Sequence, residues 1–345
     1  MRFSLRFNND TEPSEFVALA HAAEGAGFDQ VWVSHDLFLH AAPVLLTMAA
    51  GATERIGLGT GILNPYSASP AELAMTATTL QAATGGRFLL GLGAGAADFL
   101  GWAGIARREP LSRTREAVHA IRALLSGGRP ADDARAGQGW QPEALMRVRA
   151  AEVPPIYLGV MGPKMTAMAG EVADGVLPLL FPPEHFPTAD EQVAAGIRQA
   201  GRTAGDVDVA ACVWVSIDDD ADRARHALAE KIAYFGPSFS PYLLGRAGIT
   251  VDDFAPISHA VRTDGITAAA RLVTPAMLRL GIAGGPDEVV RRGRWLVDHG
   301  ARHVSFGPPL GPDPLAAVQL LGSTVLPALR EKVPSRPLPP AGSAA

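Results

Sequence analysis

Short apolar runs alternate with longer amphipathic segments along most of the chain, and this alternation constrains the fold more than any other feature. A segment with helical spacing follows each of eight runs that have the length of strands. Such alternation indicates a parallel sheet, and eight units indicate a closed (β/α)8 barrel of the α/β class. A doubly wound open sheet is the structural alternative, because it also buries both sheet faces. The predicted strands are 3–7, 30–34, 56–63, 88–92, 156–159, 175–180, 207–217 and 303–306.

The segments between these strands carry helix boundary signals. We expect Ser14 to cap the first helix, which Gly25 and Gly27 end, and Pro70 to open another. Residues 127–153 are expected to be irregular. The predicted helices are 14–26, 43–50, 70–83, 112–125, 163–173, 189–200, 220–234, 286–299 and 315–329.

Pro, Gly and Ser punctuate short helical pieces over 236–281 and interrupt the alternation. This pattern predicts a helical insertion in a single barrel domain that spans 1–332. The Pro-rich end of the chain, 333–345, is expected to be a disordered tail.

Composition excludes several classes of protein. The net charge is −5, which argues against non-specific nucleic-acid binding. The single cysteine, Cys212, excludes a disulfide within the chain and a thiolate-rich metal site, and no HxH or HExxH spacing occurs, so we expect no metal. No GxSxG elbow, signal peptide or long apolar run is present, which argues against a common serine hydrolase and a membrane span and favours the cytoplasm.

Three predicted strands end in glycine-rich turns, at the edge where barrels hold their active sites. These turns are 59–66, 91–96 and 159–164. Each suits either an ordinary turn or a close approach of backbone to a flat or anionic ligand. The second resembles a dinucleotide fingerprint but has Ala96 at the third glycine position, which argues against that motif. Pro163 can open a helix whose free amides would suit a phosphate, with Lys164 adding charge.

Titratable side chains also lie near strand ends. His35 and Asp36 follow the second strand, which ends at Ser34, and Arg6 lies inside the first. A histidine after a barrel strand is an acid–base candidate, although each of these side chains suits a structural hydrogen bond as well. Asp98, Glu184 and His185 occupy similar positions.

Several motifs, in this order and spacing, resemble the bacterial luciferase-like flavin and F420 oxidoreductases. Within that family the chain is most similar to the F420-dependent methylenetetrahydromethanopterin reductases, from Phe3 to about Leu329. The motifs are 61–66 with Pro70, 85–87, 91–95, 110–118, 162–164 with 173–175, and 306–312.

The resemblance implies a cofactor site and a reaction. A non-prolyl cis peptide at Gly61-Ile62 would back the ring of F420, and a hydride would pass between its C5 and an unsaturated or imine-like substrate. Neighbouring turns would hold the phosphate, and Lys164, Arg107 and Arg108 could meet the anionic tail. The expected cofactor-binding residues are Ser34, Gly61, Ile62, Gly93, Ala94, Gly95, Gly159, Val160, Met161, Gly162 and Pro163.

The chain departs from the reductases where the substrate would bind. Arg6 and Ala96 replace acidic residues of that branch, and His35-Asp36 reverses the usual order. We expect His35, Asp36 and Arg6 to be the catalytic residues, with Arg6 facing a negatively charged group if it points into the barrel mouth.

Other functions remain open from the sequence. One is an FMN-dependent monooxygenase with a flavin-reducing partner enzyme, and another is a non-catalytic flavin or F420-binding protein. An aldolase-like barrel is disfavoured because no predicted strand contains lysine. We expect a small-molecule substrate and an F420- or flavin-reducing partner enzyme. The resemblance also implies a homodimer or higher homo-oligomer, formed through the helices at 43–52 and 70–83.

Overall fold

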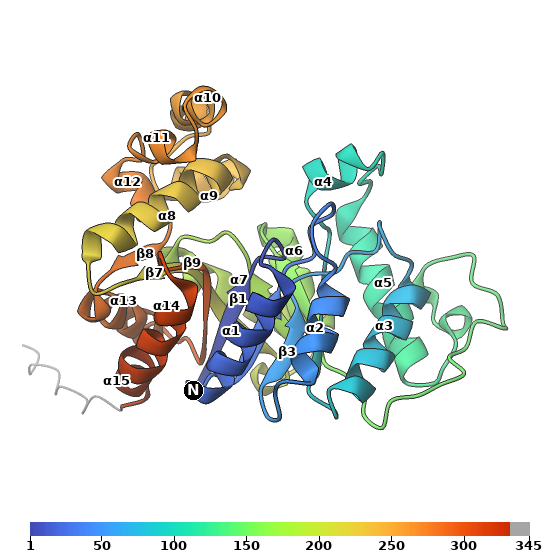
Figure 1. Cartoon of the computed structure of the whole chain (residues 1–345). Coiled ribbons are helices and arrows are strands. Elements are labelled where there is room, and N and C mark those ends of the chain that lie inside the picture. Colours follow the sequence, from blue (N-terminus) through green and yellow to red (C-terminus); the bar gives the residue numbers. More distant parts are fainter. Residues whose placement is uncertain (332–345) are drawn as a thin grey trace, which may run out of the picture.

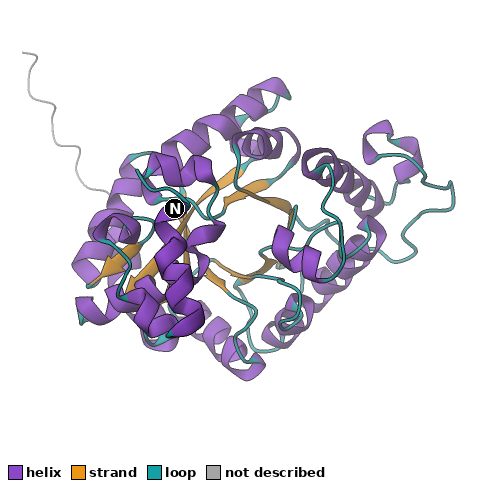
Figure 2. Cartoon of the chain, turned by 90° about the horizontal axis from the view of Figure 1, so that it is seen from above, coloured by secondary structure: helices purple, strands orange, loops and turns teal. Residues whose placement is uncertain are grey.

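Eight parallel strands close into a ring in the computed structural model, which describes residues 1–331 (Figure 1, Figure 2). The predicted (β/α)8 barrel is therefore confirmed, and the open sheet is excluded because β6 pairs with β7. The predicted tail, 333–345, lies outside the described residues. The ring runs through β1 (Arg2–Phe7), β2 (Gln30–Val33), β3 (Gly57–Thr60), β4 (Phe88–Gly93), β5 (Ile156–Val160), β6 (Gly175–Pro178), β7 (Asp208–Ile217) and β9 (His303–Leu310).

One short strand was not predicted. β8 (Ile282–Gly284) pairs with residues 215–217 at the carboxyl end of β7, outside the ring. Three residues are too few for a periodic pattern to reveal. β9 also runs to Leu310, beyond its predicted end at 306, and contains a cis Pro308-Pro309 bond.

Helices surround the ring (Figure 2). The prediction that Ser14 caps the first helix was wrong: Glu12 occupies the cap position, since Pro13 opens the helix. The predicted final helix is interrupted by a π-helical turn over Leu321–Val325, just before Pro327, whose missing N–H cannot continue the ladder. The helices are α1 (Pro13–Gly25), α2 (Ala42–Ala50), α3 (Pro70–Ala83), α4 (Ala97–Trp102), α5 (Pro110–Leu125), α6 (Pro163–Val172), α7 (Phe186–Gln199), α8 (Ala221–Phe235), α9 (Pro241–Arg246), α10 (Ala255–Thr263), α11 (Ile266–Ala270), α12 (Pro275–Leu278), α13 (Pro286–Asp298), α14 (Pro314–Leu320) and α15 (Leu326–Arg330).

Short helices rise above the barrel at the end where the strands finish. α9–α12 occupy the chain between α8 and β8 and pack on α8 through an apolar cluster that includes Leu244, Phe254 and Ile257. α4, which was not predicted, rises from the opposite side (Figure 1). These two groups flank the carboxyl ends of the strands.

Aromatic side chains fill the middle of the barrel. The rings of Trp32 and Tyr157 meet edge to face with centroids 4.8 Å apart. Gly59 makes room for this pair, because a Cβ there would lie 2.3 Å from the Trp32 ring. The interior is therefore packed, and any cavity must begin above Trp32.

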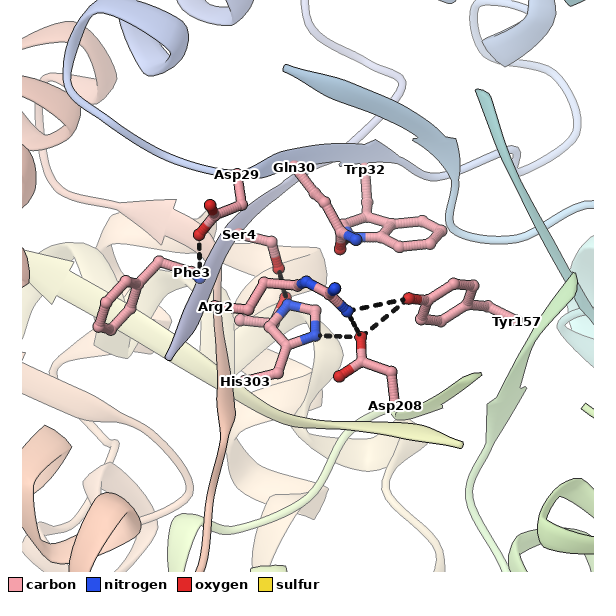
Figure 3. Close-up of polar contacts among 10 residues, drawn as sticks. Arg2, Phe3, Ser4, Asp29, Gln30, Trp32, Tyr157, Asp208 and His303 are labelled. Atoms are coloured by element: carbon pink, nitrogen blue, oxygen red, sulfur yellow. Dashed lines mark hydrogen bonds and ion pairs between the residues drawn. The ribbon is translucent and has the colours of Figure 1, made fainter. Parts of the chain in front are cut away.

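A polar cluster closes the other end of the barrel, where the strands begin (Figure 3). The Asp208 carboxylate accepts hydrogen bonds from Arg2, from the Tyr157 hydroxyl at 2.8 Å and from Nδ1 of His303 at 2.9 Å. Nε2 of His303 lies 2.8 Å from Oγ of Ser4. Burial acts to raise the pKa of Asp208, but the hydrogen bond and charge of His303 and the charge of Arg2 outweigh it and hold that pKa well below its usual range. Its position indicates a stabilising role.

We expect Asp208→Asn to lower the free energy of unfolding by about 2 kcal/mol at neutral pH, because buried His303 loses its anionic partner. The pKa of Asp208 is lower in the folded state, so its stabilisation is present above about pH 4 and declines as the pH falls below that value. Urea denaturation across this range measures both effects. Asp219→Asn, at an exposed loop position, is the control. Equal losses in both variants would contradict the assignment.

Candidate active site

A cavity of about 490 Å³ opens among the carboxyl ends of the strands. Gly93 does not line it but lies beneath Ile62, and Pro163 begins α6 behind the wall. The cavity thus gathers most of the residues that sequence reasoning selected: Arg6, Ser34, His35, Asp36, Gly61, Ile62, Ala94, Gly95, Gly159, Val160, Met161 and Gly162.

A bulge at the end of β3 forms one wall of the cavity. The Gly61-Ile62 peptide bond is cis, at the position that the family resemblance implies. The N–H of Gly61 donates to Val33 O at 2.7 Å, and the N–H of Leu63 donates to Gly91 O at 2.9 Å. The chain therefore bonds to β2 at Gly61, just before Ile62, and to β4 at Leu63, just after it.

Glycines on β4 and β5 make room for the Ile62 side chain. A Cβ at Gly159 would lie 2.7 Å from Cγ2 of Ile62, and one at Gly93 would lie 3.1 Å from Cγ1. Backbone and one isoleucine consequently form this wall, which suits a flat ring pressed against it.

Free peptide N–H groups border the same wall. α6 begins after Gly162 without a side-chain cap, and within residues 1–331 the N–H groups of Lys164 and Met165 have no acceptor. The N–H group of Gly95 is likewise unpaired in the described chain. An anion placed here would gain amide hydrogen bonds and the helix dipole.

Only one of the three expected tail-binding cations lines the cavity. Nε of Arg107 donates to Ala94 O at 3.1 Å. Lys164 is exposed at the start of α6, and Arg108 lines a separate cavity. Arg107 is therefore the cation best placed beside the free amides.

Buried Asn9, which sequence reasoning missed, organises the loop after β2. Its Oδ1 accepts from the Ser34 hydroxyl at 2.7 Å and from the N–H of Asp36 at 3.2 Å. Its Nδ2 donates to the carbonyl oxygens of Asp36 and His40. A polar residue just after β1 was the available signal. Since the Ser34 hydroxyl donates its hydrogen to Asn9, Ser34 stabilises the conformation of this loop.

His35 is held in one tautomer. The N–H of Ala42 donates to its Nδ1 at 3.1 Å, so the neutral ring carries its proton on Nε2. Burial lowers the pKa of His35, which keeps the ring neutral at pH 7. His35 can therefore donate a hydrogen bond from Nε2 into the cavity that it lines.

The opposite wall carries charged side chains. Arg6 on β1 and Asp36 line it together with Lys231 on α8, a residue that sequence reasoning missed because it examined strands and their ends. Burial lowers the pKa of Arg6, raises that of Asp36 against the opposing charge of Lys231, and lowers that of Lys231 to about 8.

Of the three other titratable residues selected from the sequence, one lines the cavity and two do not. Asp98 on α4 lines the cavity. Glu184 does not; it pairs with Arg292 at 2.6 Å. His185 is buried away from the cavity, against Phe181.

Within residues 1–331 there is no cluster of side chains able to hold a metal ion. None of the described helices has the length and apolarity to cross a membrane.

Comparisons with known proteins identify relatives of the chain. The luciferase-like monooxygenase family model matches residues 2–303. A 5,10-methylenetetrahydromethanopterin reductase of Archaeoglobus fulgidus is 34% identical over 96% of this chain and 100% of its own. An F420-dependent glucose-6-phosphate dehydrogenase of Nakamurella multipartita is 32% identical over 93% of this chain and 94% of its own.

A solved structure gives the same result. The coenzyme F420-dependent tetrahydromethanopterin reductase of Methanopyrus kandleri superposes with a TM-score of 0.87 at 30% identity, covering 95% of this chain and 99% of that one. The chain therefore belongs to the luciferase-like monooxygenase family, as its sequence motifs predict.

Proposed function

We propose that the protein is an F420-dependent oxidoreductase that transfers a hydride between F420 and a small organic substrate. The observation that carries the proposal is the wall formed by Ile62 over Gly93 and Gly159, bordered by free amides. The names of its relatives, F420-dependent reductases and dehydrogenases, favour this cofactor over FMN.

The residues present fit the cofactor. Ile62 would support the flat ring, the N–H groups of Gly95 and Met165 would bind the phosphate, and Arg107 would add positive charge. When bound, F420 supplies a hydride from C5 of its deazaflavin ring. Trp32 beneath the site helps to exclude water.

His35 and the charged wall act on the substrate in this proposal. The Nε2–H of His35 donates a hydrogen bond to the substrate atom that gains electron density. Asp36 lies near Lys231 and favours its protonated form. The sequence resemblance places Arg6 where the methanopterin reductases carry an acidic residue. We infer that the substrate differs from methylenetetrahydromethanopterin.

Titration of the purified protein with F420 and with FMN tests the proposal. We expect quenching of F420 fluorescence that saturates in the micromolar range, about −8 kcal/mol of binding free energy, and weaker binding of FMN. Hydride exchange between reduced F420 and a panel of carbonyl and imine acceptors then tests catalysis. Binding of FMN alone would favour the monooxygenase instead, and F420 binding without exchange with any acceptor would favour a non-catalytic carrier.

The homodimer remains a prediction. Val44 and Met48 on α2 and Met75 on α3 are exposed large apolar side chains, in the two helices expected to pair. Light scattering of the purified protein measures the mass that decides it.

A further inference from the structure

The cavity has two walls of different chemistry. β3, β4 and β5 contribute glycines, Ile62 and backbone amides. β1, β7 and α8 contribute Arg6, Trp214 and Lys231. If the cofactor lies on the first wall, the second faces the substrate.

Arg6 is a cation without a counter-ion. Its Nη2 donates to Val213 O at 2.9 Å, its Nε is buried without a partner, and it forms no ion pair with any carboxylate of residues 1–331. A guanidinium stays charged at neutral pH even when burial lowers its pKa. A partly buried charge without a counter-ion is costly, so an anion in the cavity would stabilise Arg6.

Lys231 adds a second positive charge to the same wall. Its Nζ lies 3.3 Å from Oδ1 of Asn8 and 3.9 Å from the centroid of the Phe235 ring, and it too forms no ion pair in the described chain. Burial and the charge of Arg6 lower the pKa of Lys231, while the charges of Asp10 and Asp36 act to raise it. With a pKa of about 8, Lys231 is mostly protonated at neutral pH.

We propose that the substrate is an anion whose carboxylate or phosphate group binds between Arg6 and Lys231. This deepens the proposed function and rests on it. The phosphate of F420 does not need these cations, because free amides and Arg107 serve it on the other wall. A neutral substrate would leave both cations unpaired when it displaced water from the cavity.

Binding of small probes to the F420-loaded protein tests this site. Benzoate represents a carboxylate, inorganic phosphate represents a phosphate, and benzamide is the neutral match of benzoate. By calorimetry we expect at least one anion to bind about tenfold or more tightly than benzamide. The anion that binds more tightly identifies the substrate group.

Variants locate the bound probe. Arg6→Met and Lys231→Met should each weaken anion binding about tenfold, while Lys231→Arg keeps the charge and the binding. Arg55→Met, at an exposed position before β3, removes an equal charge far from the cavity and should change nothing. Because the two cations come from different elements, misfolding of one variant leaves the other as a test.

The pH dependence gives an independent readout. Lys231 loses its charge as the pH rises through about 8, so wild-type affinity for benzoate should fall between neutral pH and about pH 9, whereas Lys231→Arg should hold its affinity. The groups facing Lys231 are Arg6, Asn8, Asp10, Asp36, Trp214 and Phe235. Of these, Arg6 stays protonated over that interval, because a guanidinium keeps its charge even when burial lowers its pKa.

The two proposals fail separately. If F420 does not bind, the proposed function is wrong. If F420 binds but no anion exceeds benzamide, or the methionine variants bind anions as well as wild type does, the anionic substrate is wrong and F420 dependence stands.

Discussion

The Gly159→Val variant is expected to bind F420 about 10- to 100-fold more weakly than wild type while keeping the barrel fold. A Cβ at this position would lie 2.7 Å from Cγ2 of Ile62 and 3.2 Å from Cδ1 of Leu179. Cγ2 is attached directly to the Ile62 Cβ, so the clash moves the whole side chain toward the cofactor. Overpacking of this kind costs about 1–3 kcal/mol, and each 1.4 kcal/mol is about tenfold in affinity. Fluorescence titration with F420 measures the loss.

A matched glycine controls for general effects of the substitution. A Cβ at Gly205 would have no atom within 4 Å apart from those of its chain neighbours, its φ is not positive, and it lies near the start of β7. Gly205→Val should bind F420 as wild type does. Gly159→Ala, with the smaller side chain, should have an F420 affinity between those of wild type and Gly159→Val. Wild-type affinity in Gly159→Val would show that Ile62 does not support the ring.

The cavity wall formed by β3, β4 and β5 could be predicted from sequence because its signals are local. Gly61, Gly159 and Pro163 report backbone geometry directly, since few other residues tolerate a bulge, a close contact or a helix start at those places. Parallel strands also bring their carboxyl ends to one edge, so residues distant in sequence could be grouped without knowing their contacts. Gly93 belongs to this wall but lies beneath Ile62 and does not line the cavity.

The opposite wall, which carries Arg6 and Lys231, could not be predicted in the same way. Lys231 lies one turn before the end of α8, and the sequence of α8 is that of any amphipathic helix with a basic residue. Only the position of α8, which packs against β7, β8 and α10–α12, brings this side chain to the cavity. The tautomer of His35 depends on the N–H of Ala42, a contact that no spacing rule reports.

His35→Asn is expected to lower kcat/KM for hydride transfer about 100-fold, because it removes the donor at Nε2. The Asn side chain amide can still accept from the N–H of Ala42, in place of Nδ1, so the loop after β2 should keep its conformation. Stopped-flow oxidation of reduced F420, with the acceptor that the panel selects, measures the rate. F420 affinity should remain close to that of wild type.

The His35→Gln variant tests whether the side chain acts by donating a hydrogen bond or only by filling space. Its amide nitrogen can reach the place of Nε2, so His35→Gln should recover about tenfold of the activity that His35→Asn loses. Since burial lowers the pKa of His35, the wild-type rate should show no inflection at the ordinary histidine pKa of about 6.5, and should fall only at lower pH, when protonation of Nδ1 breaks the bond from Ala42. A rate that rises with pH through about 6.5 would instead make His35 a general base, and equal rates in the two variants would remove it from the reaction altogether.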